Sequence, residues 1–403
     1  RRRQRPADHQ RSGREYVSGQ QAPIRTTQAD ASPGMIDLAI GHPSPSLLPR
    51  ELVRRAAEGR LATDFTSYLQ YGYEAGDGYF RASLAKFLSR HFGETVGEGE
   101  LFVSGGASQA LDLFCTVYTR PGDVVFVEEP TYFLALRIFQ DHGLVVVGVP
   151  ADENGLNIEA VERRLQKYRP VFLYTVPTHQ NPSGATLPRD RRTRLVELSR
   201  ERKFLIVADE VYHLLTYGKP APIPLACAPS ARTVLSLGSF SKILAPGLRL
   251  GWVQADPRLL RPLAECGLLD SGGGLNPFTS ALVLTALERG LLDSHLEHLR
   301  GEYGRRLLAM REAIETELPA AVEYSPPEGG FFLWLRLLDG RDSSTLLPEA
   351  RKRRTSFVPG SAFSASGGLR DRLRLSFSYH PPEVIREGVH RLAESLLRNP
   401  PIV

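Results

Sequence analysis

The stretch Val234-Leu-Ser-Leu-Gly-Ser-Phe-Ser-Lys-Ile-Leu-Ala-Pro-Gly-Leu-Arg-Leu-Gly-Trp252 joins a short apolar run to a dense group of polar side chains. The run is rich in apolar residues and ends at Gly238, which predicts a buried strand. Four side chains with hydroxyl or cationic groups follow within a few positions: Ser239, Ser241, Lys242 and Arg249. We therefore expect a functional site at the end of this strand.

Lys242 lies between the apolar run and Ile243, so we expect its amine to face a cavity rather than bulk water. Desolvation lowers the pKa of a lysine, and a neutral amine attacks aldehydes to form a Schiff base. Ser239, Ser241 and Arg249 carry groups that bind a phosphate monoester. An aldehyde and a phosphate on one small molecule describe pyridoxal 5′-phosphate. Taken alone, the same residues also fit a surface lysine beside a Gly/Ser turn.

The composition is that of an ordinary globular enzyme, with 403 residues, 42% hydrophobic and 24% charged. This length suits one large domain and one smaller domain. No apolar run approaches the ~18 residues that cross a bilayer. The three cysteines, Cys115, Cys227 and Cys266, have no CxxC spacing, so we expect reduced core residues rather than disulfides or a metal site. We expect a cytoplasmic location.

The net charge of +5 is concentrated at the start of the chain. Residues 1–34 hold seven arginines against three acidic residues, which is +4, so the rest carries about +1. This tail lacks hydrophobic periodicity, and we expect it to be disordered. A solvated extension without a defined role is our interpretation. A remnant of an organelle-targeting peptide and a nonspecific RNA-binding arm remain open.

From Leu101 onward, short β-rich runs alternate with helical runs. The expected strands are Leu101–Ser104, Val124–Val127, Leu144–Val149, Val171–Val176, Phe204–Ala208, Val234–Leu237 and Leu250–Gln254, the last one antiparallel. The expected helices between them are Ser108–Tyr118, Tyr132–Asp141, Ile158–Gln166 and Arg189–Glu201. This alternation predicts an α/β fold with a large, mostly parallel seven-stranded sheet and helices on both faces.

The remainder predicts a smaller α+β domain. A long helix at Leu292–Leu318 is expected to link the two domains, and the helix Pro382–Leu397 to close the second. The expected strands there are Ala321–Tyr324, Gly330–Leu337, Thr355–Val358 and Arg372–Phe377. We divide the chain into a tail (1–34), a segment packing with the small domain (35–65), a large cofactor-binding domain (66–292) and a small domain (293–403).

Polar residues follow several strands, where ligands bind in open α/β sheets. Asp209 comes directly after its strand, and a carboxylate there can meet the pyridine nitrogen of the cofactor and hold it protonated. A helix N-cap is the other interpretation of Asp209. Tyr212, one turn later, and Asn181 are candidates for the ring hydroxyl. The sequence Asn181-Pro-Ser-Gly184 is equally compatible with a simple turn.

Other strand ends offer further contacts. Gly106, Ala107 and Ser108 begin a helix after a glycine-rich turn and are expected to bind phosphate through their amides. Tyr132 has a ring suited to stacking on the pyridine, although core packing is commoner for a tyrosine. Arg372 and Arg374 alternate along one strand, so both could point the same way, and we expect one of them, with Arg374 as our candidate, to bind a substrate α-carboxylate.

A set of motifs occurs in a fixed order: Leu69-Gln70-Tyr71, Gln180-Asn181-Pro182-Ser183-Gly184, Ala208-Asp209-Glu210-Val211-Tyr212 and Ser239-Phe240-Ser241-Lys242. Together they resemble fold-type I pyridoxal-phosphate enzymes of the class I/II aminotransferase family, from about Ile36 to the end. The similarity is greatest to the branch of 2-aminoadipate and valine-pyruvate aminotransferases. The resemblance implies that Lys242 carries the cofactor and transfers the proton at the substrate Cα.

The resemblance further implies a homodimer in which Tyr71 reaches the neighbour's phosphate, a Gly41 close to the substrate, and a cis Asn181-Pro182 bond. Two features depart from the family pattern. Ala107 stands where a hydroxyl residue is common, and the stretch Ser271-Gly-Gly-Gly-Leu-Asn276 makes a predicted pocket loop bare of side chains. Both leave the identity of the amino acid open.

We weigh three functions. The first is amino transfer between an L-amino acid and a 2-oxo acid such as 2-oxoglutarate or pyruvate. A lyase, decarboxylase or cyclase on the same fold is the second, since the motifs do not fix which bond breaks. The third is a regulator that uses such a domain as a sensor, for which residues 1–34 are too short and polar to form a winged-helix domain. We expect no sequence-specific nucleic-acid binding and no membrane association.

Overall fold

The computed structural model describes residues 27–28 and 33–397, so almost all of the predicted disordered tail lies outside the described residues. Within them the main sheet has eight strands in the order β2-β9-β8-β7-β6-β3-β4-β5. These strands are β2 (Leu101–Ser104), β3 (Val124–Glu129), β4 (Val145–Asp152), β5 (Gly155–Leu156), β6 (Phe172–Thr175), β7 (Leu205–Asp209), β8 (Val234–Ser239) and β9 (Gly251–Ala255).

The strand pairing confirms the predicted α/β fold with a mostly parallel sheet. The five strands β8, β7, β6, β3 and β4 are parallel to one another, and β9 is antiparallel to both β8 and β2. The strand that the sequence did not predict is β5, which folds back on β4 as an antiparallel pair of two residues. A strand this short contains no hydrophobic run that could reveal it.

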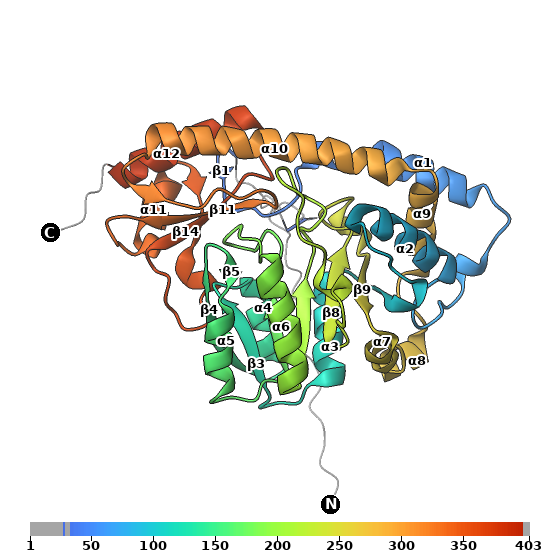
Figure 1. The fold of residues 1–403 in the computed structure, drawn as a ribbon. Coiled ribbons are helices and arrows are strands. Elements are labelled where there is room, and N and C mark those ends of the chain that lie inside the picture. Colours follow the sequence, from blue (N-terminus) through green and yellow to red (C-terminus); the bar gives the residue numbers. More distant parts are fainter. Residues whose placement is uncertain (1–26, 29–32, 398–403) are drawn as a thin grey trace, which may run out of the picture.

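Helices cover both faces of this sheet because its strands are apolar on both sides. Val207 and Leu235 pack in one apolar cluster, whereas their neighbours Ile206 and Val234 pack in another. This is the period-two alternation of a strand buried on both faces. The first cluster includes α3 (Ala107–Tyr118) and α4 (Phe133–Asp141), and the second includes α5 (Ile158–Leu165) and α6 (Arg189–Arg202), which cross the front of the sheet in Figure 1.

A second, antiparallel sheet follows the order β10-β11-β14-β13. Its strands are β10 (Val322–Glu323), β11 (Phe332–Leu337), β13 (Val358–Pro359) and β14 (Arg372–Ser376), and α11 (Ser343–Lys352) and α12 (Pro382–Leu397) lie in the same part of the chain. The single strand predicted at Thr355–Val358 is wrong. Its first half is β12 (Thr355–Ser356), which pairs with β1 (Ile36–Asp37), while its second half pairs with β14. A change of partner within four residues leaves no trace in hydrophobic periodicity.

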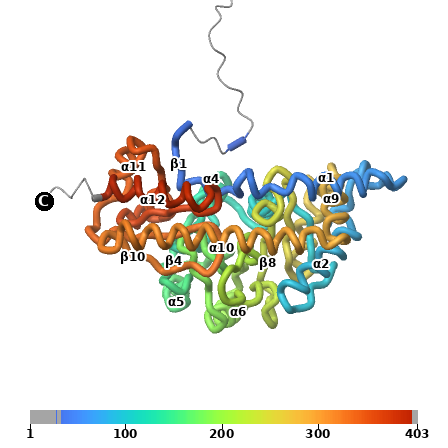
Figure 2. Tube along the Cα trace, turned by 90° about the horizontal axis from the view of Figure 1, so that it is seen from above, coloured from blue at the N-terminus to red at the C-terminus, as the bar shows by residue number. Residues whose placement is uncertain are grey.

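The helix α10 (Leu291–Glu317) has 27 residues and joins the two sheets. Figure 2 shows it running along the molecule, with α12 beside one end. The other helices are α1 (Arg50–Leu61), α2 (Gly78–Phe92), α7 (Pro257–Ala264), α8 (Gly267–Gly272) and α9 (Pro277–Glu288). In the described part of the chain, no helix has both the length and the apolar character needed to cross a membrane.

Short 3-10 helices occur at Pro45–Leu47, Ser67–Leu69, Glu98–Glu100, Leu225–Cys227, Pro246–Leu248 and Gly360–Phe363. The division into domains stays a prediction. Of the segment 35–65, β1 pairs with β12, whereas α1 contacts α9.

Candidate active site

Lys242 lies in the turn that follows β8, as the sequence predicted. Its Nζ donates a hydrogen bond to the carbonyl oxygen of Gly41 at 3.2 Å. The same nitrogen lies 6.0 Å from the ring centre of Tyr212 and 5.6 Å from that of Phe331. The amine therefore sits among aromatic rings at the edge of the sheet.

This environment lowers the pKa of Lys242 to about 8. Burial of the amine is the largest cause, followed by repulsion from the Arg374 guanidinium, and the Asp209 carboxylate opposes both. With a pKa near 8, about a tenth of such amines are neutral at pH 7, against fewer than about one in a thousand for an ordinary lysine. A neutral amine is the form that can act as a nucleophile or as a base.

Asp209 is the last residue of β7 and is buried. Its Oδ2 accepts a hydrogen bond from the phenol of Tyr174 at 2.8 Å, whereas Oδ1 has no hydrogen-bond partner among the described residues. Burial raises the pKa of Asp209 to about 6, although the Tyr174 phenol lowers it. A buried carboxylate oxygen without a donor is costly, and a protonated pyridine nitrogen is a donor that would satisfy it. The residue therefore fits pyridoxal phosphate.

The predicted phosphate-binding residues meet where α3 begins. Gly106 has φ +95°, and a Cβ there would come within 2.9 Å of Arg249 Nη2. The Arg249 guanidinium donates to the Gly105 carbonyl at 2.8 Å and lies 3.5 Å from Ser241 Oγ. Ala107 and Ser108 form the first turn of α3, whose amides have no intrahelical acceptors. A cation, a hydroxyl and a helix N-terminus in contact can hold a phosphate dianion.

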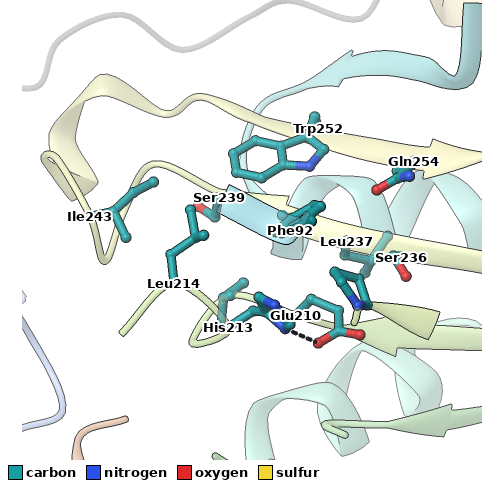
Figure 3. Close-up of a pocket in the computed structure, with 13 residues that line it drawn as sticks. Phe92, Glu210, His213, Leu214, Ser236, Leu237, Ser239, Ile243, Trp252 and Gln254 are labelled. Atoms are coloured by element: carbon teal, nitrogen blue, oxygen red, sulfur yellow. Dashed lines mark ion pairs between the residues drawn. The ribbon is translucent and has the colours of Figure 1, made fainter. Parts of the chain in front are cut away.

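Ser239, the last residue of β8, makes its hydrogen bond within the turn that follows the strand. Its Oγ accepts a hydrogen bond from the Ser241 amide at 3.1 Å, so it stabilises the turn that carries Lys242. Its side chain also lines a small pocket with Trp252 and the His213–Glu210 ion pair (Figure 3). This cavity of about 10 Å³ has room for roughly one water molecule, which excludes a cofactor. A role for Ser239 at the phosphate stays a prediction.

Arg374 lies on β14 and is buried. Its Nη1 donates to Asn181 Oδ1 at 2.9 Å, and its Nη2 donates to the Ala39 carbonyl at 2.8 Å. The guanidinium carbon lies 4.0 Å from the ring centre of Phe332 and 5.0 Å from that of Phe363. Burial lowers the pKa of Arg374 to about 10, and Nε has no hydrogen-bond partner among the described residues. This cation is therefore placed to receive an anion.

The remaining predicted residues surround this group. Asn181 is followed by a cis peptide bond to Pro182, as the resemblance implied. Tyr212 is buried, and its ring contacts Phe331 and Phe332 edge-on. Burial also raises the pKa of Tyr132 to about 12, with Asp209 nearby adding to the rise. Tyr71 is the exception, since it is 82% exposed in the single chain.

A model of the family described as aminotransferase class I and II matches residues 33–392. The chain belongs to this family.

Three similar proteins agree with this assignment. Aromatic-amino-acid aminotransferase 1 of Thermococcus litoralis is 36% identical, covering 90% of this chain and 88% of its own. The crystal structure of Pyrococcus horikoshii kynurenine aminotransferase, in complex with PMP, is 36% identical with a TM-score of 0.85 and 91% coverage of each chain. That of α-aminoadipate aminotransferase from Thermus thermophilus, complexed with N-(5′-phosphopyridoxyl)-L-leucine, is 34% identical with a TM-score of 0.82, covering 92% of this chain and 95% of its own.

The protein is therefore a pyridoxal-phosphate-dependent aminotransferase, and the resemblance inferred from the motifs is confirmed. Sequence reasoning missed two contributors to the aminotransferase site. The sequence places Tyr174 only within the strand Val171–Val176, and Ala39 only within the segment 35–65. The one available signal for Tyr174 was a tyrosine within a fully apolar strand, since a buried phenol needs a hydrogen-bond partner.

The first two residues of the predicted bare loop Ser271–Asn276 belong to α8, and the rest of the stretch packs against other backbone. The Gly274 amide donates to the Gly72 carbonyl at 2.7 Å, which pairs the loop with the segment that carries Tyr71. At its end, Asn276 Nδ2 donates to the Arg249 carbonyl. The glycines thus let two backbones pack directly against each other.

Proposed function

We propose that this aminotransferase acts on an L-amino acid whose α-carboxylate pairs with Arg374, and passes the amino group to 2-oxoglutarate or pyruvate. The observation that carries the proposal is the buried Arg374 guanidinium. It is held by the neutral acceptors Asn181 and Ala39, and no carboxylate among the described residues contributes to its pKa. A buried unpaired cation is costly, and a planar carboxylate matches its forked geometry.

The cofactor is assigned to the strand ends. Asp209 would hold the ring nitrogen through Oδ1, Tyr212 and Asn181 would bind the ring hydroxyl, and Tyr132 would pack on the ring. The phosphate would be held by Gly106, Ala107, Ser108, Ser239, Ser241 and Arg249. Bound pyridoxal phosphate supplies an electron sink for the carbanion that forms at the substrate Cα. The uncompensated Asp209 Oδ1 and the group around Arg249 support this assignment.

Lys242 removes the proton from the substrate Cα in this proposal. Its lowered pKa supports the role, because a base works best when its pKa lies near the operating pH. Lys242→Ala is expected to lower kcat by more than about 1,000-fold, since general-base catalysis contributes 10²–10⁴-fold and the covalent attachment is lost as well. Lysine acylation of the cofactor-free protein should show one site titrating near pH 8. Titration near 10.5 would contradict the role.

Aromatic L-amino acids are proposed as donors. The names of the Thermococcus and Pyrococcus relatives support this class, and so do the rings of Phe133, Phe332 and Phe363 around Arg374. The test mixes holoenzyme with single donors and 2-oxoglutarate or pyruvate, and measures the glutamate or alanine formed. L-2-Aminoadipate is the comparison donor, suggested by the Thermus relative. Loss of CO₂ or of a side chain without amino transfer would contradict the reaction.

Arg374→Ala should raise KM for every donor by at least about 30-fold, because removing one partner of a buried charge pair costs 2–5 kcal/mol. Arg372→Ala is the matched control, since Arg372 lies two residues away on the same strand and is only partly buried. Equal effects of the two substitutions would contradict the assignment of the α-carboxylate to Arg374.

A homodimer is proposed in which Tyr71 completes the partner's site. Support comes from apolar side chains exposed around Tyr71 in the single chain, which are Leu61, Phe65, Leu69, Tyr73 and Tyr79. Mixing inactive Lys242→Ala with impaired Tyr71→Ala should restore activity, because a hybrid dimer contains one site with both residues intact. Sedimentation as a monomer, or no recovery in confirmed hybrids, would contradict the proposal.

A further inference from the structure

Tyr174 is completely buried in the centre of β6. Its ring packs against Phe139, with ring centres 5.6 Å apart, and the phenol is the one polar group of the side chain. A buried hydroxyl without a partner costs free energy, so an acceptor close to the Tyr174 phenol stabilises the fold. That acceptor is Asp209 Oδ2, at 2.8 Å.

The register of the sheet places the two residues within reach of each other. Tyr174 on β6 pairs with Val207 on β7, and Asp209 lies two residues beyond Val207 on the same face. Diagonal neighbours of this kind are about 7–8 Å apart at Cα, a distance that a tyrosine side chain spans. The hydrogen bond is therefore fixed by two rigid strands rather than by a loop.

The two oxygens of Asp209 are consequently not equivalent. Oδ2 is occupied by Tyr174, and Oδ1 has no hydrogen-bond partner among the described residues. The other charged or titratable groups that act on Asp209 are Glu128 at the end of β3, Tyr132, Glu210, Tyr212 and Lys242. Among these side chains, Tyr174 is the one that donates a hydrogen bond to the carboxylate.

We propose that Tyr174 is a positioning residue for the cofactor ring: its hydroxyl fixes Asp209 Oδ2, keeps the carboxylate ionised and leaves Oδ1 as the oxygen that meets the ring nitrogen. The proposal rests on the proposed function through the role of Asp209. It extends that function by a residue that touches neither substrate nor cofactor.

The pKa of Asp209, about 6, makes the hydroxyl important at neutral pH. Burial raises this pKa, and the Tyr174 hydrogen bond is the largest effect that lowers it. The Val211 amide and the Lys242 amine lower it less, so removing the hydroxyl should raise the pKa of Asp209 further. A protonated Asp209 no longer attracts the proton of the ring nitrogen.

The test compares Tyr174→Phe with Tyr118→Phe. Phenylalanine keeps the ring of Tyr174 and removes only the hydroxyl. In the control, Tyr118 loses an equivalent hydrogen bond, 2.8 Å to the Leu259 carbonyl, on the surface of α3. Two quantities are measured for each variant. The first is the Kd of pyridoxal phosphate for the cofactor-free protein, by fluorescence titration. The second is the apparent pKa on the acid limb of the pH profile of kcat/KM for the holoenzyme.

Tyr174→Phe is expected to raise the cofactor Kd about 10-fold at pH 6.5, because losing a hydrogen bond to a charged group is worth about one pKa unit. The increase should shrink toward pH 8.5, and the acid limb should move up by about one pH unit. Tyr118→Phe should leave both unchanged. A Tyr174→Phe protein with the cofactor affinity and pH profile of the wild type would overturn the proposal.

Two further variants cover other outcomes. If Tyr174→Phe does not fold, 3,5-difluorotyrosine at position 174 keeps the hydroxyl and makes it a stronger donor. The acid limb of the kcat/KM profile should then move to lower pH, and no shift would overturn the proposal.

In an Asp209→Asn background, Tyr174→Phe should add no further rise in cofactor Kd. If the effects of the two substitutions on the free energy of cofactor binding were fully additive, that would also overturn the proposal. Because the cofactor titrations need no turnover, they stand even where a lack of amino transfer defeats the proposed function.

Discussion

Two glycine-rich segments of this aminotransferase look alike in sequence and differ in structure. In the first, Ser104–Gln109, a Cβ on Gly106 would approach the tip of the Arg249 side chain, 2.9 Å away. In the second, Ser271–Asn276, a Cβ on Gly274 would come within 1.7 Å of the Tyr73 carbonyl oxygen. The first glycine makes room beside a movable cation, whereas the second lets two backbones touch.

The two segments therefore need glycine for different structural reasons. A glycine beside a guanidinium and a helix N-terminus leaves space that a phosphate can enter. A glycine in contact with a backbone carbonyl leaves no space for a ligand. Its substitution should therefore lower the stability of the fold first, and should affect ligand binding only by displacing the segment that carries Tyr71. Each segment also contains a glycine whose Cβ would crowd neither a cation nor backbone: Gly105 in the first segment and Gly272 in the second. Alanine at these two positions provides the control for substitutions at Gly106 and Gly274.

Gly274→Ala should produce the largest effect. Its Cβ would collide with backbone, and overpacking of this kind costs about 3 kcal/mol or more of unfolding free energy. Denaturant unfolding of the holoenzyme measures the loss. Gly272→Ala should stay within about 0.5 kcal/mol, because its Cβ would meet nothing within 4 Å. A Gly274→Ala protein as stable as Gly272→Ala would remove the contrast between the two segments.

Gly106→Ala should cost about 2 kcal/mol of unfolding free energy, because φ +95° with ψ 169° is a conformation that essentially only glycine adopts. It should also weaken cofactor binding, since Arg249 must move. The cofactor Kd and the unfolding midpoint are compared with those of Gly105→Ala, whose Cβ would make an ordinary 3.4 Å contact with Gln109. Unchanged cofactor affinity in Gly106→Ala would argue against a phosphate at this turn.

Asn276→Ala should cost about 1 kcal/mol, because it removes the hydrogen bond to the Arg249 carbonyl and places alanine at φ 53°. Asn276→Gly separates the two causes, since glycine accepts this φ and lacks only the side-chain donor. Equal stability of the alanine and glycine variants would assign the whole loss to the hydrogen bond.

Inorganic phosphate should give the smallest and most selective effect. At a concentration equal to its Kd, it stabilises the cofactor-free protein by about 0.4 kcal/mol. The wild type and Gly274→Ala should both show the corresponding rise in Tm, whereas Gly106→Ala should not. Equal stabilisation of both variants would mean that phosphate binds away from the first segment.

The parts of the site that lie at strand ends were predictable from sequence. Asp209 directly follows one apolar run and Lys242 lies four residues after the end of another, and parallel strands bring such positions to one edge. The contact between Arg374 and Asn181 joins residues 193 positions apart, and no local pattern encodes it. The hydrogen bond of Tyr174 could not be predicted for another reason: its partner depends on the register between β6 and β7, which periodicity alone does not determine. The divided strand at Thr355–Val358 escaped prediction because the chain changes partners there.

The segment from Ile36 to Gly41 connects the small sheet with the reactive amine through its backbone. The Ile36 amide donates to Arg354, the Leu38 carbonyl accepts from Ser376, and the carbonyls of Ala39 and Gly41 accept from Arg374 and Lys242. These six residues therefore link the small sheet to both Arg374 and Lys242 through backbone hydrogen bonds. Under the proposed function, the segment would hold the anchor of the α-carboxylate and the catalytic base in a fixed relation to each other.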